Sequence, residues 1–173
     1  MPTVLRGARC TLRPFRSGDA EAICAAADDY MVARWMTRAF PHPYTIADAD
    51  RWIEIAATKA RGHFYAIEVD GTLAGGVGVE PFAGERSGGA AFGYWLGRAY
   101  WGRGIATDAA GVVSDDALSR GELRRLEARV FAPNVASARV LEKCGFQLEA
   151  RLKSFYLDRE NRVCDALLFA RFA

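Results

Sequence analysis

A glycine-containing segment at residues 100–107 constrains the fold of this chain more than any other stretch. Its sequence is Tyr-Trp-Gly-Arg-Gly-Ile-Ala-Thr, and an aromatic and apolar run at residues 91–96 precedes it. Aromatic side chains suit a pleated, half-buried surface, so this run predicts a strand. After the glycines, small and apolar residues recur at helical spacing (Ala106, Ala110, Val113 and Ala117), which predicts a helix packed on a sheet. The unit is therefore a strand, a glycine loop and a helix.

This unit is suited to binding an anion. The first backbone amides of a helix lack internal partners and lie at the positive end of the helix dipole. Gly102 and Gly104 permit positive φ and allow the backbone to approach a phosphate closely, and Arg103 adds a positive charge. An ordinary turn that starts a helix is the alternative interpretation.

Two familiar nucleotide loops do not fit the spacing. A Walker loop needs Lys and then Ser or Thr after its second glycine, where this chain has Ile105 and Ala106. A dinucleotide-binding fingerprint needs a third small residue at the position of Thr107 and should open a βαβ unit.

Composition limits the classes of protein that remain. A length of 173 residues predicts a single domain, residues 1–173, with a sizeable core. The net charge of +2 is spread without a block of either sign, so nucleic acid is not an expected partner. Four scattered cysteines and two histidines do not indicate a metal site, and buried thiols in a reducing cytosol are favoured. Without a signal peptide or an apolar stretch of about 18 residues, a cytoplasmic protein with no membrane partner is expected.

The first half of the chain alternates between short strands and helices. Residues 10–13 read as a strand, and Ser17 is expected to cap a helix that begins near Asp19. Further helices are expected at residues 30–36 and from Thr45 to near Gly62.

The second half predicts a mixed sheet. Asp70-Gly71 is a strong hairpin-turn signal between strands at residues 63–69 and 72–79. Because a helix connects the strands at residues 90–96 and 126–131, these two strands should run parallel. A helix from Asn134 to Lys143 and a closing hairpin of residues 146–157 and 163–172 complete an α+β fold, with a mostly antiparallel sheet and helices on both faces.

The glycine loop resembles the coenzyme A pyrophosphate loop of the GNAT superfamily of N-acetyltransferases. That loop has Gln or Arg, then Gly, then Gly or Ala, and Trp101, Gly104 and Ala106 stand at these places. The run from Trp101 to Thr107 is similar to the RimJ/RimL-type branch, which is ribosomal-protein-N-terminal-acetyltransferase-like. Further likenesses to this branch are Leu-Arg-Pro at residues 12–14 and the Asn-x-x-Ser and Lys-x-Gly-Phe segments at residues 134–146, so the resemblance covers nearly the whole chain.

The resemblance implies a fold and an activity. The GNAT fold has a central, mostly antiparallel mixed sheet of about seven strands, with a splayed parallel pair whose gap accepts pantetheine. The implied activity is transfer of acetyl from acetyl-CoA to a primary amine by direct attack, without a metal. The acceptor is expected to be a protein N-terminal amine. An antibiotic, a peptide toxin or a polyamine is the alternative acceptor, and a non-catalytic acyl-CoA sensor is the alternative function. Both a monomer and a homodimer remain open.

The resemblance also implies site residues. The implied cofactor-binding residues are Trp95, Leu96, Trp101, Gly102, Arg103, Gly104, Ile105, Ala106, Thr107, Asn134 and Ser137. Ser137 is the implied hydroxyl near the coenzyme A sulfur, and Glu80 is the implied base acting through water. Tyr44, Trp35 and Tyr156 are the implied acceptor-binding residues.

Each of these residues also has a purely structural interpretation. Ser137 suits the solvent face of a helix, Glu80 the end of a strand, and Asn134 a helix N-cap. The chain departs from the wider family at Leu141, where many members have Tyr. It also lacks a carboxylate at residues 154–156, where some relatives of this branch have Glu.

Overall fold

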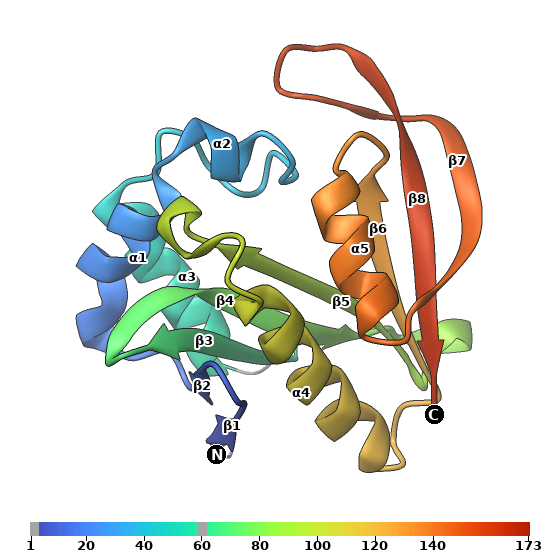
Figure 1. Ribbon diagram of the computed structural model, residues 1–173, viewed down its shortest axis with the longest axis horizontal. Helices are drawn as coiled ribbons and strands as arrows, with labels where there is room; N and C mark the ends of the chain where they lie inside the picture. Colours follow the sequence, from blue (N-terminus) through green and yellow to red (C-terminus); the bar gives the residue numbers. More distant parts are fainter. Residues whose placement is uncertain (1–3, 59–61) are drawn as a thin grey trace.

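A computed structural model of the chain describes residues 4–58 and 62–173. In these residues the chain forms one eight-stranded sheet with the order β1-β2-β3-β4-β5-β6-β8-β7 (Figure 1). Neighbouring strands are antiparallel except β5 and β6, so the predicted mixed sheet is confirmed. The strands are β1 (Leu5–Arg6), β2 (Thr11–Arg13), β3 (His63–Val69), β4 (Thr72–Pro81), β5 (Gly89–Leu96), β6 (Arg125–Phe131), β7 (Gln147–Leu157) and β8 (Val163–Phe172).

The α-helices of the described residues cover both faces of this sheet (Figure 1). The hydrophobic core has two parts, one on each face of the sheet. Side chains of β3 contribute to both parts, because successive strand residues point to opposite faces. Tyr65 and Ile67 pack in the core that α4 and α5 cover, whereas Ala66 packs in the core that α1 and α3 cover. The helices are α1 (Ala20–Ala27), α2 (Tyr30–Ala33), α3 (Ile46–Thr58), α4 (Ile105–Ser119) and α5 (Val135–Lys143).

Several local predictions are confirmed. Asp70 and Gly71 have φ angles of 50° and 78°, as the turn between β3 and β4 requires. The side-chain oxygen of Asn134 accepts a hydrogen bond from the Ser137 amide at 3.3 Å, so Asn134 does cap α5.

Other local predictions need correction. The seven strands expected are joined by an eighth, the two-residue β1, which is too short to leave a periodic signal. The helix expected at residues 30–36 ends at Ala33. The expected end of the helix near Gly62 falls on residues 59–61, which lie outside the described residues.

The predicted cap at Ser17 is also wrong. Ser17 begins a 3-10 turn, and α1 starts after Asp19. The Asp19 carboxylate accepts hydrogen bonds from the Arg16 amide at 2.7 Å and from the Arg13 guanidinium at 2.8 and 2.9 Å. A buried, bidentate charged pair therefore fixes this corner, and such pairs are stronger than a neutral hydroxyl cap.

The parallel strands β5 and β6 pair only at their beginnings. Their register joins Gly89, Ala90 and Ala91 of β5 to Arg125, Leu126 and Glu127 of β6. Beyond Ala91, β5 continues to Leu96 beside β4, and β6 continues to Phe131 beside β8. The sheet therefore opens between the carboxyl ends of these two strands, as the resemblance implied.

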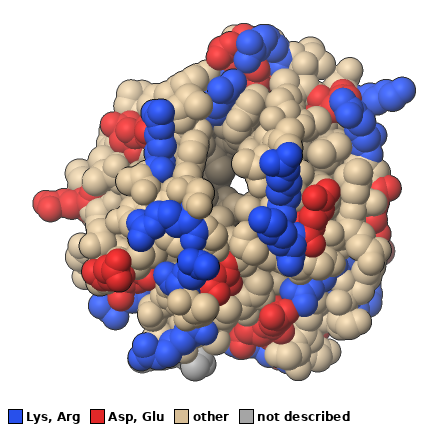
Figure 2. All heavy atoms as spheres, in the orientation of Figure 1, with Lys and Arg blue, Asp and Glu red and all other residues tan. Residues whose placement is uncertain are grey.

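The β7–β8 hairpin spans this opening at its far end and meets the segment around α2 (Figure 1). Arg159 in the hairpin turn donates to the backbone carbonyls of Ala33, at 2.7 Å, and of Phe40. Tyr30 donates to Glu160 at 2.7 Å. These hydrogen bonds connect the two sides of the splayed sheet. Figure 2 shows a hollow at the centre of the molecule, between the connected parts.

Candidate active site

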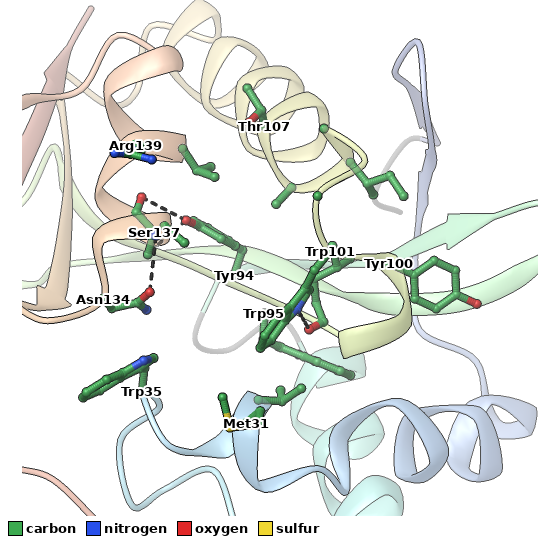
Figure 3. Close-up of a pocket in the computed structure, with 18 of the residues that line it drawn as sticks. Met31, Trp35, Tyr94, Trp95, Tyr100, Trp101, Thr107, Asn134, Ser137 and Arg139 are labelled. Carbon is green, nitrogen blue, oxygen red and sulfur yellow. Dashed lines mark hydrogen bonds between the residues drawn. The ribbon is translucent and has the colours of Figure 1, made fainter.

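A cavity of about 560 Å³ occupies the opening between β5 and α5. The end of β5, the glycine loop and the first turn of α4 form one wall. The first two turns of α5 form the opposite wall, and residues around α2 close the third side (Figure 3). The cavity is thus built from segments that are separate in sequence and that the splayed strands hold apart.

The glycine loop has the conformation that the sequence analysis required. Gly102 and Gly104 have φ angles of 71° and 74°, in the left-handed region that glycine adopts without strain. Gly104 is the N-cap of α4, which runs for 15 residues from Ile105. The loop therefore directs the free amides of a long helix toward the cavity, an arrangement that fits a pyrophosphate.

Trp101 stands where the wider family has Gln or Arg, and it has a structural role here. Its indole Nε1 donates to the Leu96 carbonyl at 2.7 Å, so it ties the glycine loop back to the end of β5 (Figure 3).

Asp108, in the first turn of α4, attaches the N-terminal turn to this loop. Its carboxylate accepts from the amides of Ala8 and Arg9 at 3.1 and 2.7 Å. Gly7 leaves room for the carboxylate, because a Cβ there would lie 2.2 Å from Asp108 Oδ2. The Arg9 side chain consequently lies against Gly104, where an added Cβ would be 3.2 Å from its Nε atom.

Basic side chains line the mouth of the cavity. Arg34 lies on the α2 side, and Arg139 and Lys143 project from α5. Figure 2 shows basic side chains on both sides of the central hollow. These cations complement the phosphate charges of a nucleotide-containing ligand. Arg103 does not line the cavity and instead lies 5.7 Å from the ring centroid of Tyr100.

A second cavity, also about 560 Å³, lies on the other side of β5. Gly76 makes room for its wall, because a Cβ there would lie 2.8 Å from Nε1 of Trp95. Glu80 lines this cavity at the end of β4. The two cavities share Met36, Tyr94 and Trp95, so they meet at the opening of the sheet. The aromatic residues that line the second cavity are Phe40, Tyr44, Trp52, Phe64, Phe92, Tyr94 and Trp95.

The structure brings most of the predicted site residues to these cavities. Ten of the eleven predicted cofactor-binding residues line the first cavity, Arg103 being the exception. Glu80 and Tyr44 line the second cavity, but Trp35 lines the first. Tyr156 lines neither and stacks on Phe131, with ring centroids 4.4 Å apart.

Tyr94 is a site residue that sequence reasoning missed. Its hydroxyl lies 2.8 Å from the Ser137 hydroxyl, and burial raises the pKa of Tyr94 to about 12. In the sequence, Tyr94 is one of several aromatic residues in the strand. Only its position directly before Trp95 could have indicated that it belongs to the site. Arg139 was also missed, because nothing in the helical pattern showed that it faces the opening.

Within residues 4–58 and 62–173, no three His, Cys, Asp or Glu side chains gather closely enough to hold a metal ion. Among the same residues, no helix has the length and apolar character needed to cross a membrane. Cys10 and Cys144 are buried, while Cys24 and Cys164 are half-buried.

Known proteins resemble the chain in sequence. Residues 9–147 match the family model described as the acetyltransferase (GNAT) domain. The uncharacterized N-acetyltransferase p20 of Bacillus licheniformis is 28% identical over 165 residues, covering 94% of this chain and 92% of p20. The uncharacterized N-acetyltransferase YoaA of Bacillus subtilis (strain 168) is 31% identical over 157 residues, covering 88% of this chain and 87% of YoaA.

Solved structures resemble the chain in fold. RimJ of Mycobacterium smegmatis, in complex with a CoA disulfide, superposes with a TM-score of 0.85 at 26% identity, covering 99% of this chain and 88% of RimJ. RimL, a ribosomal L7/L12 α-N-protein acetyltransferase in complex with coenzyme A, gives 0.86 at 17% identity, covering 98% of both chains. From the family match and the site geometry, the chain belongs to the GNAT family of acetyl-CoA-dependent N-acetyltransferases.

Proposed function

We propose that this protein transfers the acetyl group of acetyl-CoA to a primary amine by direct attack, and that the acceptor is a protein N-terminal amine. The observation that carries the proposal is the pair of cavities that meet at Met36, Tyr94 and Trp95. The first cavity suits a phosphate-bearing donor, and the second is open to an acceptor. Acetyl-CoA supplies an acetyl group activated as a thioester.

The donor side is formed mainly by backbone groups. The amides of residues 102–106 hold the pyrophosphate, and Arg139 and Lys143 balance its charge. β5 has no strand pairing with β6 beyond Ala91, so the edge of Trp95 and Leu96 faces the opening. Backbone groups on this edge bind the pantetheine arm and orient the acetyl carbonyl, and such positioning can supply much of the rate enhancement.

The transfer needs little additional chemistry. The amine nitrogen forms a bond to the acetyl carbon, the carbon–sulfur bond breaks, and its electron pair goes to sulfur. The new ammonium group gives up a proton to water. Glu80 lines the second cavity and accepts that proton through the water, as a general base does.

An N-terminal α-amine is the acceptor that suits this chemistry best. Its pKa is about 8, against about 10.4 for lysine, so a lysine acceptor would cost roughly 3 kcal/mol more to deprotonate. A site whose base acts through water therefore favours the α-amine. RimL, a ribosomal L7/L12 α-N-protein acetyltransferase whose fold this chain shares, supports the same acceptor class.

A small-molecule amine is the second candidate, and the aromatic lining of the second cavity favours it. Seven aromatic side chains surround this cavity, so an acceptor with a planar ring could stack there. MccE, a microcin C7 self-immunity acetyltransferase solved with acetyl-CoA and AMP, shares the fold with a TM-score of 0.84 at 21% identity, covering 100% of this chain and 98% of MccE.

The test is release of free coenzyme A thiol from acetyl-CoA in the presence of an amine panel. The panel contains peptides beginning with Ala or Ser, the same peptides with a blocked N-terminus and an internal lysine, aminoglycosides, polyamines and aminoacyl nucleotides. Turnover with the free N-terminal peptides alone is the expected result. Turnover only with a small amine would favour the second candidate. Tight acetyl-CoA binding without turnover on any amine would favour a non-catalytic acyl-CoA sensor.

A further inference from the structure

Tyr94 on β5 and Ser137 on α5 are joined across the opening of the sheet (Figure 3). Their hydroxyl oxygens are 2.8 Å apart, and the Tyr94 hydroxyl also donates a hydrogen bond to the Ser137 carbonyl oxygen at 3.2 Å. Both side chains line the first cavity, and Tyr94 also lines the second. The pair therefore lies where the donor and acceptor cavities meet.

The direction of the hydrogen bond between the hydroxyls follows from their acidities. A phenol is a stronger acid than an aliphatic hydroxyl, and Tyr94 is also the donor to the Ser137 carbonyl, so we assign its proton to both Ser137 oxygens and Ser137 Oγ as an acceptor. Burial holds the pKa of Tyr94 at about 12, so its proton is present at any working pH. Asn134 accepts from the Ser137 amide and not from its hydroxyl. The Ser137 hydroxyl proton is consequently directed away from Tyr94.

We propose that Tyr94 is a positioning residue that turns the Ser137 hydroxyl proton toward the coenzyme A sulfur, where Ser137 donates a hydrogen bond to the departing thiolate. This inference rests on the proposed function and names a residue for its leaving-group step. Leu141, where many members of the family have Tyr, is fully buried and does not line the first cavity. Tyr94 supplies a phenol from β5 instead.

The pair stabilises the thiolate without protonating it. A thiol has a pKa of about 8.5, well below that of the buried phenol, so complete proton transfer from Tyr94 to the thiolate would be unfavourable. A hydrogen bond to a charged acceptor is stronger than one to a neutral acceptor. The pair should therefore lower the pKa of bound coenzyme A thiol, and this effect is measurable without any acceptor amine.

The test measures the affinity of coenzyme A by calorimetry from about pH 6.5 to pH 9.5, with desulfo-coenzyme A as the matched ligand without a thiol. Wild-type affinity for coenzyme A should rise roughly tenfold across this range, relative to desulfo-coenzyme A, since one pKa unit is a factor of ten. Tyr94→Phe and Ser137→Ala should each remove most of this rise. Tyr65→Phe is the control, because Tyr65 is a fully buried tyrosine of β3 outside both cavities.

A double variant tests whether Tyr94 acts through Ser137. With an amine that is turned over, each single variant should lower kcat about tenfold and leave KM for acetyl-CoA within about twofold. Tyr94→Phe in the Ser137→Ala background should lower kcat no further, because its target hydroxyl is already gone. A further tenfold loss in the double variant would overturn the positioning role.

The remaining outcomes separate this inference from the proposed function. If coenzyme A affinity in the wild type depends on pH no more than desulfo-coenzyme A affinity, the inference is wrong, whether or not turnover occurs. The same conclusion follows if Ser137→Ala removes the dependence and Tyr94→Phe does not. If both variants remove it but no amine is acetylated, the inference holds and the proposed enzymatic function fails.

Discussion

Replacing Gly104 with Ala tests whether the left-handed loop is what binds the donor. At φ 74° an alanine costs about 1 kcal/mol more than a glycine. The added Cβ would lie 3.2 Å from Nε and 3.4 Å from Cδ of Arg9, but this exposed side chain can move aside at little cost. The backbone conformation therefore dominates the effect.

The chain offers a matched control in Gly121. It has φ 76°, lies just past the end of α4, and has no atom within 4 Å of an added Cβ. Gly121→Ala should cost the same 1 kcal/mol or so and lower Tm by about 2–4 °C, but coenzyme A affinity should not change.

Gly104→Ala should also weaken coenzyme A binding. The free loop can relax away from the left-handed conformation, and binding must restore it, so the cost of about 1 kcal/mol appears as a roughly fivefold higher Kd by calorimetry. Wild-type affinity in Gly104→Ala would refute the role of the loop conformation. An equal loss of affinity in Gly121→Ala would show that the effect is global.

Three further predictions follow from single contacts. Trp101→Phe removes the hydrogen bond to the Leu96 carbonyl, so KM for acetyl-CoA should rise several-fold and the free energy of unfolding should fall by about 1 kcal/mol. Arg159→Met should raise KM for the acceptor more than Kd for coenzyme A, and should speed hydrogen exchange at residues 158–162, because it removes the hydrogen bonds from the hairpin to the Ala33 and Phe40 carbonyls. Asp19→Asn should lower the free energy of unfolding by about 2 kcal/mol, because buried Arg13 loses one charged partner but keeps its ion pair with Glu68. Burial alone would raise the pKa of Asp19, but hydrogen bonds from Arg13 and the Arg16 amide lower it below 3.8. Wild-type stability should therefore fall as pH drops below about 4, and chemical denaturation should show a weaker dependence in Asp19→Asn.

The sequence could predict that the proposed donor residues line one cavity, because most of them are close together in the chain. The strand end, the loop and the helix start occupy residues 95–107, and their spacing is fixed by the turn that they form. Positive φ at Gly102 and Gly104 and the cap at Asn134 follow from local backbone requirements, which residue identity reveals directly. Arg103 is the exception, because it was predicted to bind the cofactor but does not line the first cavity.

The acceptor side could not be predicted in the same way. Its wall combines residues from the α2–α3 connection, from α3 and from β4 and β5, and their meeting depends on the packing of the whole sheet. Trp35 and Tyr156 illustrate the difficulty. Both were predicted to bind the acceptor, but Trp35 lines the first cavity and Tyr156 stacks on Phe131. The Tyr94–Ser137 bond was invisible for the same reason, as 43 residues separate its partners.

The hairpin contacts indicate how this fold can change acceptors without losing its donor. Arg159 holds the backbone of Ala33 and Phe40, and Arg38 holds the Asp158 carbonyl and Asn161. Phe40 and Arg38 themselves line the second cavity, the proposed acceptor site, whereas the glycine loop and α5 take no part in these contacts. Substitutions in the hairpin turn should therefore reshape the acceptor wall and leave the pyrophosphate loop unchanged. On the proposed assignment of the two cavities, separate parts of the structure then set acceptor choice and donor binding.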